Sequence, residues 1–254
     1  MSNQLDGTVA LITGASSGIG EATAIALAER GAKVAVAARR KDRLDELVTR
    51  IEAAGGAALA IEADMTDQHQ AEATVARTVE ALGRLDTLFN NAGVMLLAPA
   101  KHSELADWDR MIDINIKGLL YTAHAALPHL LSAAEDSPRG VADLINTSSV
   151  AGRVARPGSS VYNLTKFGVT AFTDALRQEV AAKHVRVSAV EPGLVATELT
   201  EHMNDRAKQA LRERLGGVEA LHASDIAEIV TFIVTRPRRV AINELLVRPT
   251  EQIT

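Results

Sequence analysis

The chain has 254 residues, a formal net charge of −5 and no cysteine. Without cysteine, disulfides, thiolate metal sites and cysteine nucleophiles are excluded, and the acidic balance disfavours nucleic acid as a partner. No apolar run approaches the ~20 residues of a membrane span, and the stretch Met1 to Gly7 has no apolar targeting region, so we expect a cytoplasmic protein without a membrane partner.

The first part of the chain alternates short apolar runs with segments of helical period, which predicts repeated βα units and a parallel sheet. Strands are expected at Val9–Thr13, Val34–Ala38, Ala57–Glu62 and Leu85–Asn90, with helices at Ile19–Arg30, Asp42–Ala54 and Gln68–Leu82. Glycines follow each of these helices, as expected at helix ends.

The second part continues the alternation with longer helices. We expect a helix over Glu104–Leu131 that Pro128 bends or ends, a polar loop over Ala133–Gly140, a strand at Val141–Thr147, a helix over Ser160–Lys183 and a strand at Val185–Val190. A polar helical segment follows at Thr197–Leu215, then a helix capped by Ser224 that runs to Val234, and a last strand at Leu245–Arg248.

This order predicts one α/β domain over residues 1–254. It is a doubly wound Rossmann-type domain, a seven-stranded parallel sheet with helices on both faces, and it has a lid segment at about 194–216. Such sheets bind ligands beyond the carboxyl ends of their strands, where the strand order reverses.

Three glycines follow the first strand, Gly14, Gly18 and Gly20. Glycine permits a tight turn and a close approach of the backbone to a diphosphate, and the N–H groups at the start of the next helix attract phosphate. The spacing, four and then two, differs from the usual dinucleotide motif. An ordinary strand–helix turn is the alternative, but the position after the first strand favours cofactor binding.

The second strand ends in Ala37-Ala38-Arg39-Arg40, where an NAD-binding fold has an acidic residue for the ribose 2′-hydroxyl. Guanidinium groups instead hold a 2′-phosphate through charge-assisted hydrogen bonds. We therefore expect NADP(H) rather than NAD(H), with Arg39 as the main contact and Arg40 as the second. A solvated basic start of a helix is the alternative.

Tyr162 and Lys166 lie four residues apart on a predicted helix and so share one face. We expect the ammonium to lower the pKa of the phenol and tune it for proton transfer. Ser149 follows the preceding strand, where its hydroxyl can donate to a carbonyl oxygen that gains negative charge. Ser148 is expected to cap backbone groups at that strand end. For a lone Tyr–Lys pair, a surface contact is the alternative.

The motifs Thr-Gly-x-x-x-Gly-x-Gly, Asn-Asn-Ala-Gly, Asn-x-x-Gly, Ser and Tyr-x-x-x-Lys, in this order between about Leu5 and Thr250, resemble those of the short-chain dehydrogenase/reductases. The resemblance implies that Tyr162 is the acid/base, that Lys166 holds the nicotinamide ribose and that Ser149 polarises the carbonyl. It also implies that Asn115 holds a water that relays protons to Lys166. The expected cofactor-binding residues are Gly14, Ser16, Ser17, Gly18, Ile19, Gly20, Arg39, Arg40, Asp64, Met65, Asn91, Ala92, Gly93, Tyr162, Lys166, Pro192, Gly193, Val195 and Thr197.

Within the family, the stretches Ala37–Arg40, Phe167–Val169 and Arg248–Thr250 resemble NADP-dependent 3-hydroxy acid dehydrogenases and clavulanic acid dehydrogenase. Two residues depart from the expected pattern. Leu164 stands where the family usually has a small residue, and Asp143 lies in an apolar strand and needs a partner if it is buried.

The sequence thus predicts an NADPH-dependent oxidoreductase, a carbonyl reductase or alcohol dehydrogenase, that acts on a ketone, aldehyde or secondary alcohol. An NADP-binding redox sensor without turnover is the alternative. Pocket walls are expected at Met95–Leu97, Val150–Arg156 and Glu198–Met203, with Arg153 and Arg156 either solvated or bound to a substrate carboxylate.

No metal is expected, because His124 and His129 lack metal-ligand spacing. The apolar faces of the two long helices and the family resemblance imply a homotetramer, with a dimer as second choice.

Overall fold

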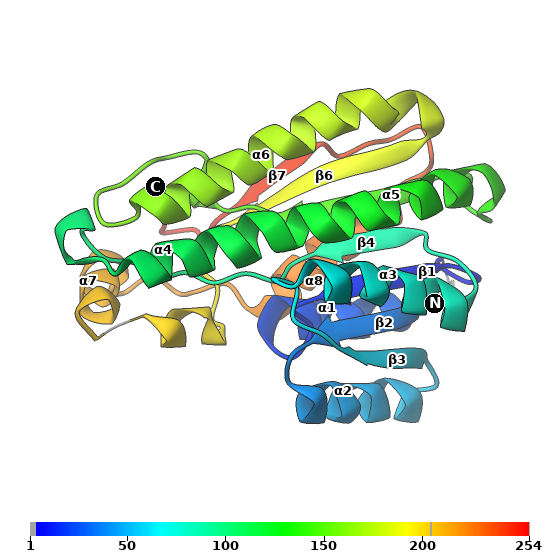
Figure 1. Cartoon of the computed structure of the whole chain (residues 1–254), viewed down its shortest axis with the longest axis horizontal. Helices are drawn as coiled ribbons and strands as arrows, with labels where there is room; N and C mark the ends of the chain where they lie inside the picture. The colour runs from blue at the N-terminus through cyan, green and yellow to red at the C-terminus, as the bar shows by residue number, and fades with distance from the viewer. Residues whose placement is uncertain (1–3, 204, 254) are drawn as a thin grey trace.

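Parallel strands form the centre of the molecule (Figure 1). Within the residues that the computed structural model describes, 4–203 and 205–253, seven strands pair in the order β3-β2-β1-β4-β5-β6-β7. They are β1 (Val9–Thr13), β2 (Lys33–Ala38), β3 (Ala57–Glu62), β4 (Thr87–Asn90), β5 (Ala142–Thr147), β6 (Val185–Pro192) and β7 (Glu244–Val247). All pairings are parallel, which confirms the predicted doubly wound sheet. Its strand order reverses between β1 and β4.

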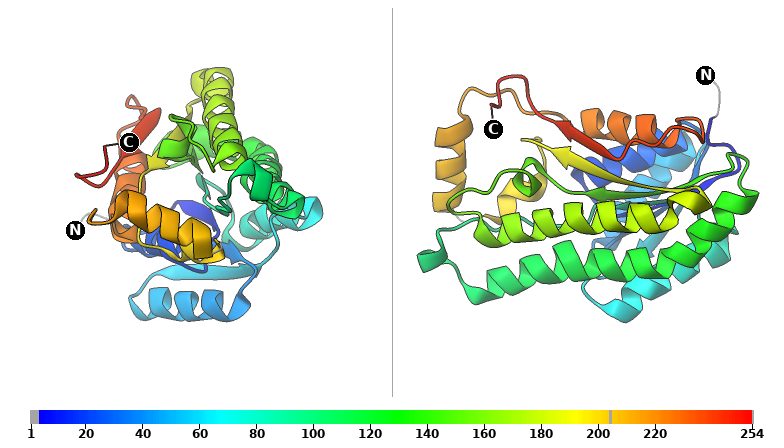
Figure 2. Two further views of the ribbon diagram at one scale, coloured as in Figure 1. Left: turned by 90° about the vertical axis from the view of Figure 1, so that its left-hand side faces the viewer. Right: turned by 90° about the horizontal axis from the view of Figure 1, so that it is seen from above.

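Helices cover both faces of the sheet (Figures 1 and 2). One face carries α1 (Gly18–Ala28), α2 (Lys41–Ala53) and α8 (Ala223–Val234), and the other carries α3 (Gln68–Leu82), α5 (Leu119–Asp136) and α6 (Ser160–Val180). Successive strand residues alternate between the two layers. In β1, Leu11 packs into the layer of α3 and α5, whereas Ile12 packs into the layer of α1 and α8.

The shorter helices α4 (Leu105–Ile112) and α7 (Asp205–Leu215) lie near the carboxyl ends of the strands. In the described ranges, no helix combines the length and the apolarity that a bilayer crossing demands.

The long helix expected at Glu104–Leu131 differs in the structure. A π-helical turn, η2 (Asp113–Gly118), separates α4 from α5, and α5 continues past Pro128 to Asp136. Pro128 is exposed, so the carbonyl that lacks a proline N–H partner faces water, and the helix continues. The polar loop predicted at Ala133–Gly140 therefore begins later.

Two other expected helix boundaries were also wrong. The segment Thr197–Leu215 is divided into η5 (Glu198–His202) and α7, and residue 204 between them lies outside the described residues. Helix α8 begins at Ala223, before Ser224, because the Asp225 carboxylate accepts a 2.7 Å hydrogen bond from the backbone N–H of His222.

The buried Asp143 has its partners. Arg186 donates to its carboxylate at 2.7 and 3.0 Å, and Arg139 donates at 2.9 Å. Asp143 and Arg186 are directly opposite each other in β5 and β6, so their ion pair favours this register, because a shifted strand would leave an uncompensated buried charge. Leu164 causes no crowding, because it lies on the solvent side of α6 and is 62% exposed.

Candidate active site

A cavity of about 770 Å³ opens at the carboxyl ends of the strands. Every strand from β1 to β6 is followed by residues that line it. They include Gly14 after β1, Arg39 and Arg40 after β2, Asp64 and Met65 after β3, Asn91, Ala92 and Gly93 after β4, Ser148 and Ser149 after β5, and Gly193 after β6. Parallel pairing brings these sequence-distant segments to one edge of the sheet.

The structure places nearly all of the predicted site residues on this cavity. Among the expected cofactor-binding residues, Gly20 does not line it. A Cβ at Gly20 would lie 2.5 Å from the Gly14 carbonyl oxygen, so Gly20 permits close packing of α1 on the turn. Of the four expected catalytic residues, Ser149, Tyr162 and Lys166 line the cavity and Asn115 lies behind its wall.

The turn between β1 and α1 forms a cradle of backbone. Gly14 has φ +65°, and a Cβ there would lie 2.8 Å from the Ala92 Cα, so a larger residue would be both strained and crowded. The Asn91 side-chain amide donates to the carbonyls of Thr13 and Gly14 at 3.2 and 3.3 Å. No side-chain bond from Ser17 caps α1. The cradle therefore fits a diphosphate held by backbone N–H groups.

Arg40 is the guanidinium that contacts this turn. It donates to the Ser16 hydroxyl from Nε at 3.1 Å and to the Ser17 hydroxyl from Nη2 at 2.8 Å. The Arg39 side chain is 64% exposed and lies 3.9 Å from the Asp64 carboxylate. Arg39 was expected to be the main contact and Arg40 the second, but Arg40 is the one that contacts the glycine turn. The chain turns into α2 after β2, and this turn directs Arg40 toward α1.

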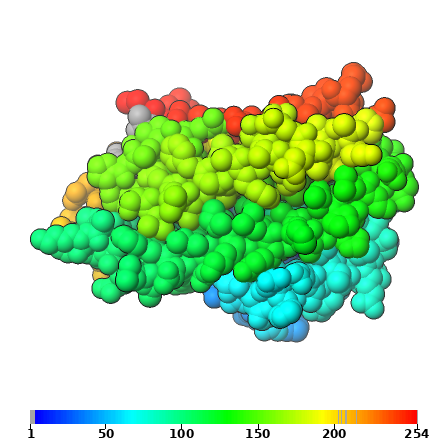
Figure 3. Space-filling view, turned by 45° about the horizontal axis from the view of Figure 1, so that its top comes forward, coloured from blue at the N-terminus to red at the C-terminus, as the bar shows by residue number. Residues whose placement is uncertain are grey.

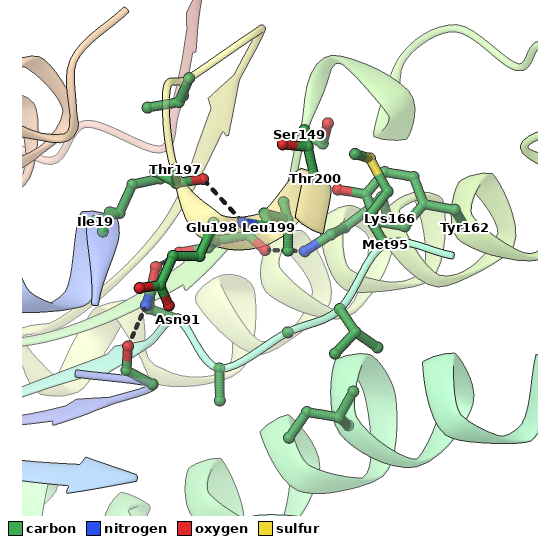
Figure 4. A pocket seen from close by; sticks show the side chains of 18 of the residues that line it. Ile19, Asn91, Met95, Ser149, Tyr162, Lys166, Thr197, Glu198, Leu199 and Thr200 are labelled. Atoms are coloured by element: carbon green, nitrogen blue, oxygen red, sulfur yellow. Dashed lines mark hydrogen bonds between the residues drawn. The ribbon is translucent and has the colours of Figure 1, made fainter. Parts of the chain in front are cut away.

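Tyr162, Ser149 and Lys166 are buried together on one wall of the cavity (Figure 4). Burial raises the pKa of Tyr162 to about 12, and a hydrogen bond with Ser149 opposes that rise. The Lys166 Nζ lies 5.8 Å from the centroid of the Tyr162 ring and donates to the Thr147 carbonyl at 2.7 Å.

Burial lowers the pKa of Lys166 to about 8. The lowered phenol pKa expected from the neighbouring ammonium is therefore not found in this structure, where burial has the largest effect on the pKa of Tyr162.

Asn115 lies in the π-helical turn and is 1% exposed. Its side-chain oxygen accepts from the Val94 N–H at 2.8 Å, and its amide donates to the Val94 carbonyl at 2.9 Å and to the Thr165 hydroxyl at 3.2 Å. These bonds join the loop after β4 to α6, one residue before Lys166. Proton relay through a water at Asn115 stays a prediction.

The loop between β5 and α6 is held from two sides. The Ser148 hydroxyl donates to the Lys166 carbonyl at 3.0 Å, so it caps a helical carbonyl rather than the strand end. Arg153 donates from Nε to both oxygens of the buried Glu191 at 2.9 and 2.8 Å and also pairs with Glu244. Arg153 is thus engaged in the framework and does not line the cavity, which is against the alternative that it binds a substrate carboxylate.

Arg156 is placed differently. Its backbone N–H donates to the Asn163 side-chain oxygen at 3.1 Å, and the residue lines the cavity. Its Nη2 is buried without a hydrogen-bond partner, and no ion pair joins its guanidinium to another described residue. Arg156 therefore carries a guanidinium on the cavity wall that no described carboxylate neutralises, so an anion bound beside it would be stabilised.

Apolar side chains form the wall near Tyr162. Met95 and Leu97 line the cavity, whereas Leu96 turns away into the core. Leu199, Leu211 and Leu215 close the cavity from η5 and α7, and the two α7 leucines were not foreseen because that segment is very polar. Among the described residues, no group of three His, Cys, Asp or Glu side chains is arranged to hold a metal ion.

Comparison with known proteins gives consistent matches over the whole chain. Residues 8–208 match the family model described as short chain dehydrogenase. Glycine betaine reductase of Emericella nidulans is 38% identical over 248 residues, which is 98% of this chain but 19% of that protein. An uncharacterized oxidoreductase of Staphylococcus saprophyticus is 37% identical over 254 residues, covering 98% of this chain and 99% of that protein.

Among solved structures, the closed form of a serine dehydrogenase complexed with NADP+ superposes with a TM-score of 0.87 at 32% identity, over 97% of both chains.

Proposed function

This chain belongs to the short-chain dehydrogenase family of oxidoreductases, and from that premise we propose that it is an NADPH-dependent reductase of ketones or aldehydes. The observation that carries the proposal is the cavity itself. It joins a glycine cradle and two arginines at one end to Ser149, Tyr162 and Lys166 at the other. An extended dinucleotide and a small carbonyl substrate require both ends.

The cofactor-binding part of the proposal concerns the residues after β1 to β4 and β6. The cradle at Gly14–Ile19 would hold the diphosphate, Asn91, Ala92 and Gly93 would line the adenosine side with Asp64 and Met65, and Lys166 would hold the nicotinamide ribose. Arg40, with Ser16 and Ser17, would hold the 2′-phosphate, and Arg39 would be the second guanidinium. The NADP+ complex of the serine dehydrogenase supports this choice. When bound, the nicotinamide supplies or accepts the hydride.

Proton transfer is assigned to Tyr162. With a pKa raised to about 12, the phenol keeps its proton at neutral pH, which is the state that can protonate a carbonyl oxygen. Ser149 would hold that oxygen through its hydroxyl. Lys166, with a pKa lowered to about 8, carries a positive charge near pH 7 and would stabilise the phenolate left behind. These states favour reduction near neutral pH.

The substrate would combine an apolar part with a negative charge. Met95 and Leu97 provide the apolar wall, and Arg156 offers an unpaired cation on the same cavity. Serine, the substrate named for the serine dehydrogenase, also carries a carboxylate. We therefore favour a carboxylate-bearing carbonyl compound or its hydroxy acid.

A redox sensor that binds NADP(H) without turnover would need only the cofactor half of the cavity. The buried Ser149 and Tyr162 on the other wall favour an enzyme, because cofactor binding alone does not require a hydroxyl and a phenol placed together for proton transfer.

A panel of carbonyl compounds, read by the loss of nicotinamide absorbance, tests the proposal. The panel contains matched ketones with and without a carboxylate, each assayed with NADPH and with NADH. We expect turnover with NADPH to exceed turnover with NADH and the carboxylate ketones to be preferred.

Arg156→Gln should raise the KM of the carboxylate ketones by about tenfold, the scale of one charged hydrogen bond, and leave the neutral ones within about twofold. Tight NADPH binding without turnover of any compound would favour the sensor.

A further inference from the structure

The Arg40 guanidinium is held by more than the glycine turn. Its Nη1 lies 2.9 Å from the Glu198 carboxylate, which also forms a hydrogen bond with the Ser17 side chain. We call this contact the Arg40–Glu198 bridge. Glu198 is the first residue of η5 and extends from it into the cavity (Figure 4).

This bridge joins two parts of the chain that lie on opposite sides of the cavity. Arg40 follows β2 and contacts the turn before α1, whereas Glu198 follows β6 and begins the segment that leads to α7. Thr197 also lies against the glycine turn, because a Cβ on Gly18 would be 3.0 Å from the Thr197 Cγ2. The start of η5 therefore rests directly on the glycine turn.

The bridge uses the groups that the proposed function assigns to the 2′-phosphate. Arg40, Ser16 and Ser17 offer a guanidinium and two hydroxyls, a donor set suited to a tetrahedral anion. One of these hydroxyls and one guanidinium nitrogen are bound to a carboxylate of the chain itself. Two anions cannot share this position without strong repulsion.

We propose that Glu198 is a built-in competitor of the 2′-phosphate, displaced from Arg40 and Ser17 when NADP(H) binds. The inference rests on the proposed function only in that the ligand carries a 2′-phosphate. A cofactor without this group leaves the bridge intact. Glu198 therefore lowers the affinity for NADP(H) relative to NAD(H). Its displacement by the 2′-phosphate also releases the start of η5 from the glycine turn.

Stability of the fold does not account for the bridge. The side chains are 44% and 39% exposed, and exposed ion pairs contribute little to folding free energy. Arg40 holds the pKa of Glu198 below its ordinary value. The carboxylate is therefore charged at neutral pH and competes with the phosphate there. Arg39 forms a long, exposed ion pair with Asp64, at 3.9 Å, and has no such contact with Glu198.

The test uses 2′,5′-ADP and 5′-AMP, which differ in the 2′-phosphate and contain no nicotinamide. Their dissociation constants are measured by calorimetry for the full chain, for Glu198→Gln and for the matched control Glu201→Gln, an exposed residue of the same η5. We expect Glu198→Gln to bind 2′,5′-ADP about threefold to tenfold more tightly, with 5′-AMP changed by less than about twofold. The control should leave both constants unchanged.

Limited trypsin digestion gives a second measurement that does not depend on affinity. Helix α7 contains Arg206, Lys208 and Arg212, at which trypsin cleaves. Saturating 2′,5′-ADP should speed cleavage in α7 relative to saturating 5′-AMP, and in Glu198→Gln the two ligands should give equal rates.

The outcomes separate this inference from the proposed function. If the unmodified chain binds 2′,5′-ADP no better than 5′-AMP, the NADP(H) assignment fails. If it does prefer 2′,5′-ADP, but Glu198→Gln leaves that constant unchanged, weakens it or tightens 5′-AMP equally, Glu198 is not a competitor of the 2′-phosphate. Equal cleavage of the unmodified chain with both ligands contradicts the coupling to η5.

Discussion

Burial decides the charge states of Tyr162 and Lys166 more than their mutual contact does. The sequence predicts the pair from its spacing, because positions four apart share a helix face. The sequence does not predict how deeply the two side chains are buried, because their burial depends on the packing of α6 against the loops after β4 and β5. The same limit applies to Glu198, whose partner Arg40 is distant in the sequence, and to Arg153, whose charge is taken up by Glu191.

The lowered pKa of Lys166 has a consequence for stability. Between about pH 8, its value in the folded chain, and 10.5, its ordinary value, the unfolded chain holds a proton that the folded chain has lost, so stability rises with pH. For Tyr162 the sign is opposite: its contribution is present below pH 10 and is lost as pH rises through about 12.

We therefore expect the unfolding free energy of the native chain to rise by about 3 kcal/mol relative to Lys166→Met between about pH 8 and pH 10.5. Urea denaturation of both proteins at several pH values measures this difference. A difference independent of pH over that window would show that Lys166 titrates at its ordinary value.

At the scale of elements, the strands were predicted closely and the helices less so. Strands β1 and β2 are recognisable because apolar residues run continuously where both faces are covered. The π-helical turn at Asp113–Gly118 was missed, because it arises from the fit of Asn115 to Val94 and not from local composition. The prediction that the helix ends near Pro128 was wrong for a related reason. A proline on the water-facing side of α5 does not end the helix, and the sequence does not show which side faces water.

Helices α5 and α6 lie side by side on one face of the molecule (Figures 2 and 3). Leu120 on α5 and Leu164 and Phe167 on α6 are exposed there, at 37%, 62% and 42%. A contiguous apolar patch on one face is typical of an association surface, whereas single exposed leucines are not. We propose that a second copy of the chain covers this face, in a homotetramer or a dimer.

Sedimentation velocity at low micromolar concentration checks this proposal. Leu164→Glu should shift the chain toward monomer and leave its circular dichroism unchanged, because Leu164 makes no core contact. Leu105→Glu, at a 70% exposed leucine on α4, is the control and should not shift it. A monomeric native chain would refute the assembly.

At the scale of the whole molecule, function follows from bringing the ends of six strands to one cavity. The sequence placed the glycine turn after β1, the arginines after β2, and both Ser149 and Tyr162 after β5, and the strand order then determines that they meet. The sequence did not predict that Leu211 and Leu215 line the cavity, since α7 carries few apolar residues.

We propose that one cavity binds NADPH through the cradle and transfers a proton through Tyr162. The most direct test measures NADPH affinity and turnover together in Tyr162→Phe. We predict a dissociation constant within about twofold of that of the native chain and a turnover lower by about 100-fold or more, the usual contribution of a general acid. Turnover equal to that of the native chain would contradict the account.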